Sequence, residues 1–386
     1  MIRPAVVSFV VALALLGAES QPSWASECSL SQVQVAPESV IDPCSEAIAD
    51  RTRPAADRGY ALFIRGMAYH NTKRFALAGQ DYDAAIELTP SNEELFVSRA
   101  NIAFRAGEEG LSFLQRALAL NPANGHALRT VGALNEDMGA LEEASRYYTM
   151  ALAADPKDAY ALLFRSKIYQ RQHRLDDALK DAEALVAIAP DDINRQGFLD
   201  GDGDRLDFHI IALKDRSYIH TLLGHFEQAE QDLNSAVAYR RSSASLAARG
   251  KFLAYRPGRD KDALSDLQEA IALGSKSYDT YFSLGLIHAR LRQFQDALAD
   301  FERTVEINPT GGDALRMRAR MHRELGQFEL AFDDMMHAVA SSESVLKQTM
   351  PILRTAGYWR SSEAPAALTP DFKDAIRACM LDKLCN

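Results

Sequence analysis

The sequence predicts an all-α protein built as a solenoid of repeated helix pairs. Two adjoining stretches of identical length, residues 125–158 and 159–192, carry the same pattern of small and apolar side chains. Within each stretch these side chains recur at three- and four-residue spacing, which is the period of an amphipathic helix and not of a strand. One helix pair cannot bury its apolar side alone, so neighbouring pairs must stack into a continuous core.

Each stretch is expected to form two short helices. In the first, Gly132 and Ala144 are small enough to let the helices approach closely, and Tyr148 fills the space beside them. Pro156 stops the second helix, because proline has no backbone N–H to continue the ladder of hydrogen bonds. The second stretch holds matching residues in the same places: Leu162, Arg165, Ser166, Tyr169, Ala178, Ala182, Leu185 and Pro190.

This pattern resembles the tetratricopeptide repeat, a helix-turn-helix unit of about 34 residues. Residues 59–92 match the family pattern better than either of these two stretches, with Leu62, Gly66, Tyr69, Ala78, Tyr82, Ala85 and Pro90. We number eight copies as repeats 1 to 8, which start at Gly59, Glu93, Gly125, Ala159, Ile210, Ser243, Tyr278 and Gly312. The resemblance implies a right-handed α-solenoid in two blocks, residues 59–192 and 210–343. It also implies the family's usual role, which is to bind another protein or peptide as a scaffold or assembly factor.

The overall charge and the motifs argue against nucleic-acid binding and catalysis. The 386-residue chain has a formal net charge of -10 at pH 7 and no basic tract, whereas nucleic-acid binding needs a basic surface that displaces phosphate counterions. The sequence lacks His-Glu-x-x-His, Gly-x-Ser-x-Gly, a phosphate-binding glycine loop and Cys-x-x-Cys. Its nine histidines are scattered along the chain, so we expect a non-enzymatic protein with no catalytic residues.

Residues 1–25 have the layout of a secretory signal peptide. Arg3 precedes an apolar run from Ala5 to Ala18, and a polar stretch follows up to Ala25, after which we expect cleavage. The apolar run is shorter than the roughly 20 residues that a spanning helix needs. A permanent membrane anchor is the alternative. The expected location is therefore a bacterial periplasm or the exterior, with no membrane span after cleavage.

Four cysteines support export and lie near the two ends of the chain. An even number in an exported protein indicates two disulfides, with three pairings open. We expect local pairing of Cys28 with Cys44 and of Cys379 with Cys385; free thiols or end-to-end pairs are the alternatives. In a straight helix the Cα atoms of Cys379 and Cys385 would lie about 9 Å apart, beyond the roughly 7 Å limit of a disulfide. The last helix is therefore expected to break between them.

Both ends of the repeat array are expected to carry caps. Residues 26–58 precede the first repeat and would cover its apolar face, which water would otherwise contact. Residues 344–386 are expected to form a C-terminal helical cap. This segment also resembles the helical peptidoglycan-binding domain of exported bacterial proteins, through Leu353, Gly357, Tyr358, Pro370, Ala375 and Ile376. Two alternative functions follow: binding of cell-wall glycan through this segment, or service as an accessory subunit that holds an enzyme in the groove.

An acidic insertion, residues 193–209, interrupts the array between repeats 4 and 5. Asp200, Asp202 and Asp204 follow the alternate spacing of a calcium-binding loop, and Asp207 follows them. The match is partial, because Arg205 stands where such a loop needs glycine. A solvated acidic loop is the simpler interpretation and calcium binding is the alternative. No other cofactor is expected.

The resemblance further implies a groove lined by the first helix of each repeat, where positions 2, 5, 9 and 12 or 13 face a bound peptide. In repeats 1 and 2 these positions hold mostly apolar or aromatic residues, which suit hydrophobic side chains of a partner: Tyr60, Phe63, Met67, His70, Val97, Asn101 and Phe104. Later repeats add mainly cationic residues: Lys167, Arg171, Lys214, Tyr218, Arg290, Arg316, Arg320 and Arg323. The planar guanidinium favours an acidic stretch or a free C-terminus as ligand. The alternative is that these arginines pair with neighbours such as Asp313 and Glu324 and only solvate the surface.

Overall fold

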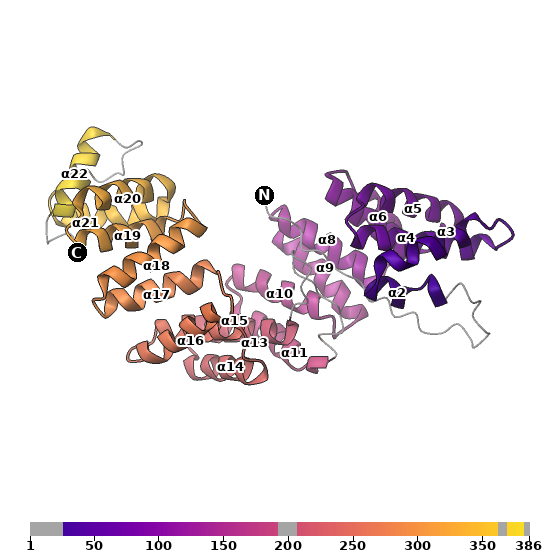
Figure 1. The fold of residues 1–386 in the computed structure, drawn as a ribbon, viewed down its shortest axis with the longest axis horizontal. Coiled ribbons are helices and arrows are strands. Elements are labelled where there is room, and N and C mark those ends of the chain that lie inside the picture. The colour runs from indigo at the N-terminus through magenta and orange to yellow at the C-terminus, as the bar shows by residue number, and fades with distance from the viewer. Residues whose placement is uncertain (1–25, 192–206, 362–368, 382–386) are drawn as a thin grey trace. The chain divides into compact units, whose positions relative to one another are not determined.

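The computed structural model describes residues 26–191, 207–361 and 369–381, and the regular structure in these ranges is entirely helical (Figure 1). This confirms the predicted all-α class. The expectations for the signal peptide, for Asp200, Asp202 and Asp204, and for Cys385 fall outside the described residues. None of the described helices is both long enough and apolar enough to cross a bilayer.

The helices of the repeats follow one another as the sequence pattern predicts. In chain order they are α4 (Ala55–Asn71) and α5 (Phe75–Leu88), α6 (Glu93–Ala106) and α7 (Leu111–Leu120), α8 (Gly125–Asp137) and α9 (Leu141–Ala154), α10 (Ala159–Arg171) and α11 (Leu175–Val186), α13 (Phe208–Leu222) and α14 (Phe226–Tyr239), α15 (Ser243–Ala254) and α16 (Asp260–Ala272), α17 (Tyr278–Arg290) and α18 (Phe294–Ile307), and α19 (Gly312–Glu324) and α20 (Phe328–Ser341).

Most first helices begin at the residue where the pattern starts the repeat, and two begin earlier. Pro54 precedes the first turn of α4, where its missing N–H costs no hydrogen bond. At α13 the Asp207 side chain accepts a hydrogen bond from the backbone N–H of Ile210 and so caps the helix. Asp207, which the sequence offered as a metal ligand, therefore acts as an N-cap.

The chain forms two compact units, Met1–Leu223 and Gly224–Asn386. Within each unit the second helix of a repeat packs on the first helix of the next, as in α5 on α6, α9 on α10 and α18 on α19. The predicted close approach inside a repeat is also present. A Cβ atom added at Gly66 would lie 2.6 Å from the Tyr82 ring, and one at Gly285 would lie 2.7 Å from the Phe301 ring. Such contacts leave room for glycine alone.

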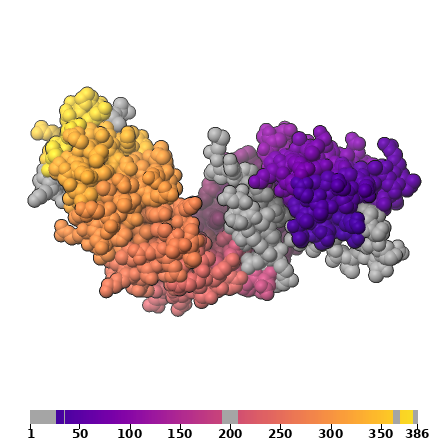
Figure 2. Space-filling model, viewed as in Figure 1, coloured from indigo at the N-terminus to yellow at the C-terminus, as the bar shows by residue number. Residues whose placement is uncertain are grey.

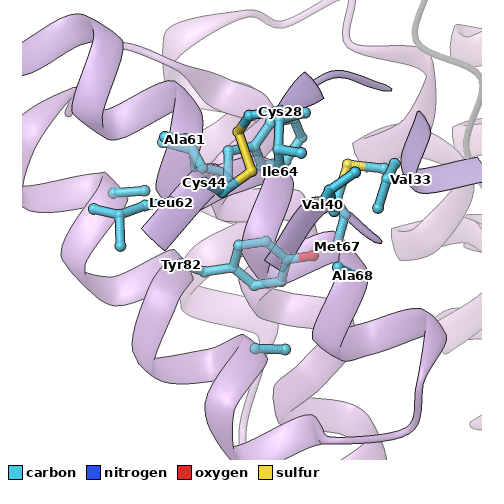
Figure 3. Packing of buried hydrophobic residues seen from close by; sticks show 14 of the residues in the cluster. Cys28, Val33, Val40, Cys44, Ala61, Leu62, Ile64, Met67, Ala68 and Tyr82 are labelled. Atoms are coloured by element: carbon cyan, nitrogen blue, oxygen red, sulfur yellow. A yellow bond between two sulfur atoms is a disulfide. The ribbon is translucent and has the colours of Figure 1, made fainter. Parts of the chain in front are cut away.

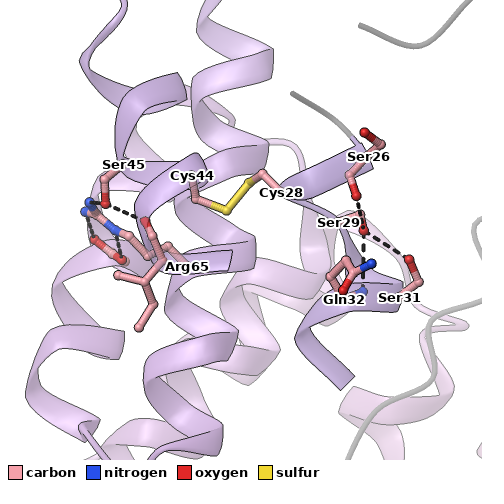
Figure 4. The surroundings of a disulfide bond; sticks show 10 residues. Ser26, Cys28, Ser29, Ser31, Gln32, Cys44, Ser45 and Arg65 are labelled. Atoms are coloured by element: carbon pink, nitrogen blue, oxygen red, sulfur yellow. Dashed lines mark hydrogen bonds and ion pairs between the residues drawn. A yellow bond between two sulfur atoms is a disulfide. The ribbon is translucent and has the colours of Figure 1, made fainter. Parts of the chain in front are cut away.

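The N-terminal cap consists of α2 (Leu30–Val35), the short 3-10 helix η1 (Pro37–Val40) and α3 (Ile41–Ala49). A buried disulfide joins Cys28 to Cys44, with Cα atoms 5.1 Å apart, which confirms the predicted local pairing (Figure 4). Val33 and Val40 belong to the same buried cluster as Met67 of α4 (Figure 3). The cap thus completes the core of repeat 1.

The C-terminal cap consists of α21 (Glu343–Thr355) and α22 (Pro370–Leu381), and α22 lies against the last repeat (Figure 2). Phe372 and Ile376 are buried in one cluster with Leu315 of α19. The Trp359 ring meets the Phe372 ring edge-on at 5.2 Å between centroids. Cys379 is disulfide-bonded, and its predicted partner Cys385, with the expected helix break, lies outside the described residues.

Candidate functional site

A repeated ion pair between the two helices of a repeat is the most regular polar feature of the structure. In repeat 1, Arg65 of α4 donates Nε–H and Nη2–H to the two carboxylate oxygens of Asp81 on α5, at 2.8 and 2.7 Å. We call this arrangement the clamp. Repeats 4, 6 and 8 contain the same bidentate pair with bonds of 2.5 to 2.8 Å: Arg165 with Asp181, Arg249 with Asp266, and Arg318 with Asp334.

The clamp also reaches the preceding repeat or cap. The Nη1 atom of Arg65 donates to the Ser45 hydroxyl of α3 at 2.8 Å (Figure 4). Arg165 reaches Thr149 of α9 in the same way at 2.9 Å, and Arg249 reaches Asn234 of α14 at 3.0 Å. Each of these three arginines therefore connects three helices. The clamp was not among the features predicted from the sequence, although arginine at repeat position 7 with aspartate near position 23 could have indicated it.

The predicted apolar groove of repeat 1 is largely closed. Phe63 is 6% exposed and Met67 is 9% exposed, and both share a buried cluster with the N-terminal cap. Figure 3 shows Met67 beside Val40 of the cap. Val97 is fully buried. Tyr60 is half-buried beside Leu30 of the cap. The expectation that Phe63 and Met67 line an open groove is therefore corrected: the core uses these side chains.

His70, also predicted to line the groove, is held at the end of α4 against the Phe75 ring, with 5.8 Å between ring centroids. Its Nε2 atom is buried without a hydrogen-bond partner in the described structure. Burial, helped by the charge of Arg105, lowers the pKa of His70 to about 4. The imidazole is therefore neutral near pH 7.

Asn101 belongs to a polar network on successive first helices of repeats 2 and 3, whereas Phe104 is half-buried nearby. His126 on α8 lies 3.0 Å from Glu94 on α6 through Nδ1 and 3.4 Å from the Asn101 amide through Nε2. Burial lowers the pKa of His126, and the Glu94 carboxylate opposes this shift. The arrangement suits a neutral imidazole that donates Nδ1–H to Glu94. It contains no nucleophile, so we assign it to the packing of repeats 2 and 3.

The other four predicted groove residues of the first unit are engaged or partly exposed. Lys167 lies 5.2 Å from the centre of the Phe164 ring. Arg171 pairs with Glu136 at 3.0 Å. Tyr218 is 55% exposed on α13, and Lys214 on the same helix is half-buried. This part of the surface carries mixed charge, because carboxylates accompany its cations.

The predicted arginines of the second unit differ sharply in their pairing. Arg290 donates hydrogen bonds to the Asp260 carboxylate and to the backbone oxygen of Ala254, so its guanidinium is engaged within the protein. Arg323 is mostly buried, with Glu324 at 3.6 Å. Arg316 has only a long contact of 3.6 Å to Asp313, and its Nε atom is buried without a partner in the described structure. Arg320, one turn further along α19, is exposed and forms no ion pair with the described residues.

No group of three or more metal-binding side chains occurs among the described residues. Three of the four carboxylates proposed for calcium, Asp200, Asp202 and Asp204, lie outside them. The fourth, Asp207, caps α13. The calcium hypothesis thus remains an expectation from the sequence.

Comparisons with known proteins support the repeat assignment. Models of the tetratricopeptide repeat family match residues 60–92, 136–193 and 278–310. The helix pairs in these ranges are tetratricopeptide repeats. The fold of a tetratricopeptide repeat protein from Parabacteroides merdae is similar, with a TM-score of 0.50 and 16% identity over 68% of this chain and 98% of that one. The Cut9–Hcn1 hetero-tetramer of the APC/C gives a TM-score of 0.50 at 14% identity, over 85% of this chain and 64% of that one.

Two curated relatives also resemble this chain. The Hsp70-Hsp90 organizing protein 1 of Glycine max is 26% identical over 160 residues, which are 40% of this chain and 27% of the relative. Subunit 3 of the anaphase-promoting complex of Schizosaccharomyces pombe is 24% identical over 137 residues, which are 35% of this chain and 21% of the relative. The chain thus spans only about a quarter of these proteins, and the similarity concerns the tetratricopeptide repeats.

Proposed function

We propose that this protein is a non-enzymatic scaffold that binds a partner protein along the first helices of its tetratricopeptide repeats, and that an acidic segment of the partner binds α19. Tetratricopeptide repeat proteins are typically protein-interaction scaffolds, and two relatives bear the names of an organizing protein and of a complex subunit. Function resides in particular sites and not in the fold. The proposal therefore depends on the surface of α19.

The observation that carries the proposal is the contrast between three arginines of α19. Arg318 forms a bidentate clamp with Asp334, so its guanidinium joins the two helices of repeat 8. Arg316 and Arg320 lie one turn apart and have no carboxylate within 3.5 Å among the described residues. Guanidinium groups with free donors bind carboxylates in a planar, directed way. An acidic peptide segment is the ligand that this surface fits best.

We also propose that the protein acts in an oxidising compartment outside the cytoplasm. The buried Cys28–Cys44 disulfide supports this location, because such bonds persist in secreted and periplasmic proteins and are rare in the cytosol. The layout of residues 1–25 supports it independently. Intact mass measurement of protein from a periplasmic fraction tests the location, and a first residue of Ser26 is expected.

The described residues of the C-terminal segment, 344–361 and 369–381, supply no observation in favour of glycan binding. Leu353 and Ile376, which carry much of the likeness to a peptidoglycan-binding domain, are each 1% exposed and lie in the cluster that covers repeat 8. We therefore propose that this segment is a cap, and that the partner binds elsewhere.

A site-directed photo-crosslinker tests the proposed function. Placed at the exposed Asp313 of α19, it leaves Arg316 and Arg320 intact; placed at the exposed Arg116 of α7, it serves as the control. Irradiation of intact cells and mass spectrometry should identify one protein captured from position 313 and not from position 116. The capture should disappear in the variant R316E/R320E. Equal capture from both positions, or capture unaffected by the charge reversal, would overturn the proposal.

A further inference from the structure

A cavity of about 280 Å³ opens in repeat 6, on helices other than α19. Its lining comes from α14, α15, α16 and the segments that join them: Asn234, Arg241, Arg249, Leu253, Arg259, Asp262, Ser265 and Asp266. We infer that this cavity is a binding site for an aromatic side chain, of tyrosine type, presented by a partner peptide. Repeats 1, 4, 6 and 8 each contain a clamp and lie wholly within one unit, and they differ in the side chain that stands beside the clamp.

In the other three clamp repeats an aromatic ring from repeat position 11 stands beside the clamp. The Arg65 guanidinium lies 5.8 Å from the centre of the Tyr69 ring, and Arg165 lies 5.8 Å from Tyr169. In repeat 8 the ring of His322 approaches Asp334 of the clamp at 3.7 Å. The place beside the clamp is therefore occupied by a ring in repeats 1, 4 and 8.

A second polar side chain, from the turn between the two helices, reaches the same ring. Arg74 lies 5.6 Å from the centre of the Tyr69 ring, and Arg174 lies 4.2 Å from that of Tyr169. In repeat 8 this place belongs to Gln327, which is 2.6 Å from Nδ1 of His322. In repeats 1 and 4 the tyrosine thus contacts one guanidinium from the clamp and one from the turn, both at cation–π distances.

Repeat 6 keeps both guanidinium groups and lacks the ring. Arg249 forms the clamp, and Arg259 lies in the turn between the two helices. Because this turn has one added residue, Arg259 stands one repeat position later than Arg74 and Arg174 do in repeats 1 and 4. Position 11 is Leu253, which is 2% exposed and belongs to an apolar cluster with Leu267 and Leu284. Both arginines and Leu253 line the cavity. The space that a tyrosine ring takes in repeats 1 and 4 is therefore left open here.

The walls of the cavity are held in place before any ligand arrives. Asp266 and Asn234 fix the guanidinium of Arg249, and Asp262 and Glu230 fix that of Arg259. Side chains fixed in this way lose little conformational freedom on binding. Because carboxylates already neutralise each arginine, the site needs no anionic ligand. A neutral ring that offers its negative face to a guanidinium fits better.

The size and lining of the cavity favour a side chain over a larger ligand. Pockets for drug-sized molecules span roughly 300–1,000 Å³, so this cavity is at the small end. Asp262 and Ser265 supply oxygen atoms that can accept a phenolic hydroxyl hydrogen. A tyrosine side chain in a peptide combines these features, and repeats 1 and 4 provide the precedent within the same chain.

Ligand-observed NMR on the full chain tests this site with defined probes. The probes are p-cresol, which is the tyrosine side chain alone, and N-acetyl-tyrosinamide, with N-acetyl-leucinamide as the non-aromatic control. Saturation transfer to both aromatic probes is expected, with dissociation constants in the millimolar range, and none to the leucine control. No saturation transfer to p-cresol, or equal transfer to the leucine control, would overturn the inference.

Two variants locate the binding. Leu253→Tyr supplies the missing ring from within, as in repeats 1 and 4, and should weaken p-cresol binding at least tenfold. Arg259→Ala removes one wall at a partly exposed turn and should have a similar effect, while Leu253→Met is the matched control that keeps the cavity. If p-cresol binds equally well to the wild type, L253Y and R259A, the inference fails. The α19 variant R316E/R320E should bind p-cresol normally, so this inference and the proposed function can fail separately.

Discussion

Arg65 on α4 and Asp81 on α5 form a bidentate ion pair, with bonds of 2.8 and 2.7 Å, and Arg65 also bonds Ser45 of the N-terminal cap. The two side chains are 20% and 8% exposed, and the three other clamps have nearly the same values. One side chain therefore links the cap, the first helix and the second helix. In a fold where each repeat contacts only its neighbours, such links set how successive helix pairs are aligned.

Asp81→Ala should lower the free energy of unfolding of the first unit by about 3 kcal/mol, because it leaves the Arg65 charge partly buried without a partner. Urea denaturation followed by circular dichroism measures this change. Glu38→Ala is the control, since it breaks the exposed pair of Glu38 with Arg74 and should cost less than about 1 kcal/mol. The double variant R65L/D81A should recover much of the loss, as repeat 7 carries Leu284 at position 7. Equal effects of D81A and E38A would contradict the role of the clamp.

The apolar framework could be predicted from the sequence because it repeats. Glycine or another small residue at position 8 and a large side chain at position 24 mark the close approach of two helices, and the Gly66–Tyr82 contact follows directly. The clamp was harder to foresee, because arginine at position 7 appears in only some of the repeats and its partner lies on the other helix. Pairing of charges across helices depends on a geometry that the hydrophobic period does not contain.

Replacing both Cys28 and Cys44 with alanine should loosen the N-terminal cap. The bond closes a loop with a sequence separation of 16 residues, and loss of such a constraint costs about 3 kcal/mol in the chain-entropy model. Hydrogen exchange with mass spectrometry should show faster exchange in Leu30–Val40 and in the first turns of α4. Exchange in α17–α20 of the second unit serves as the internal control and should not change. Unaltered protection of Leu30–Val40 would show that packing of Val33 and Val40 suffices.

His173→Gly should stabilise the first unit. His173 occupies the turn between the two helices of repeat 4 with a φ of 59°, a left-handed conformation that glycine adopts at Gly139, Gly224 and Gly326 in other repeats. Removing the side chain relieves about 1–2 kcal/mol of steric cost in the folded state. Glycine also gives the unfolded chain more conformational freedom, which destabilises the folded state by about 0.5–1 kcal/mol. A net gain of about 0.5–1 kcal/mol is expected in urea denaturation. Gly139→Ala should show the opposite sign, and a loss in H173G would refute the explanation.

Stability of the first unit should fall as the pH is lowered from about 6.5 towards 4. Folding lowers the pKa of His70 to about 4, whereas the unfolded chain has the ordinary value of about 6.5. Below pH 6.5 the unfolded chain therefore binds a proton that the folded protein does not bind. This difference lowers the free energy of unfolding until the pH reaches about 4. His70→Gln should therefore reduce the drop in melting temperature between pH 7 and pH 5. His337→Gln, at an exposed position of α20, is the control and should leave the drop unchanged. An identical pH dependence in H70Q and the wild type would contradict this assignment.

The candidate site could be predicted only in part. The family pattern placed both Phe63, at position 5, and Arg320, at position 9, in the groove, yet Phe63 is buried beneath the N-terminal cap and Arg320 is exposed. The difference arises from what covers each repeat, and the sequence pattern of one repeat carries no information about its neighbours. Arg290 illustrates the same limit, because its bond to Asp260 joins residues 30 positions apart in adjacent repeats.

The most direct test of the proposed function is the affinity of the crosslinked partner for the purified protein. Isothermal titration should show that R316E/R320E weakens binding at least tenfold, and that added salt weakens the wild type more than the variant, because the contact is ionic. The control R116E/R146E changes the net charge equally on second helices of repeats 2 and 3, and should bind as the wild type does. Unchanged affinity in R316E/R320E, or an equal loss in the control, would contradict the assignment of the partner to α19.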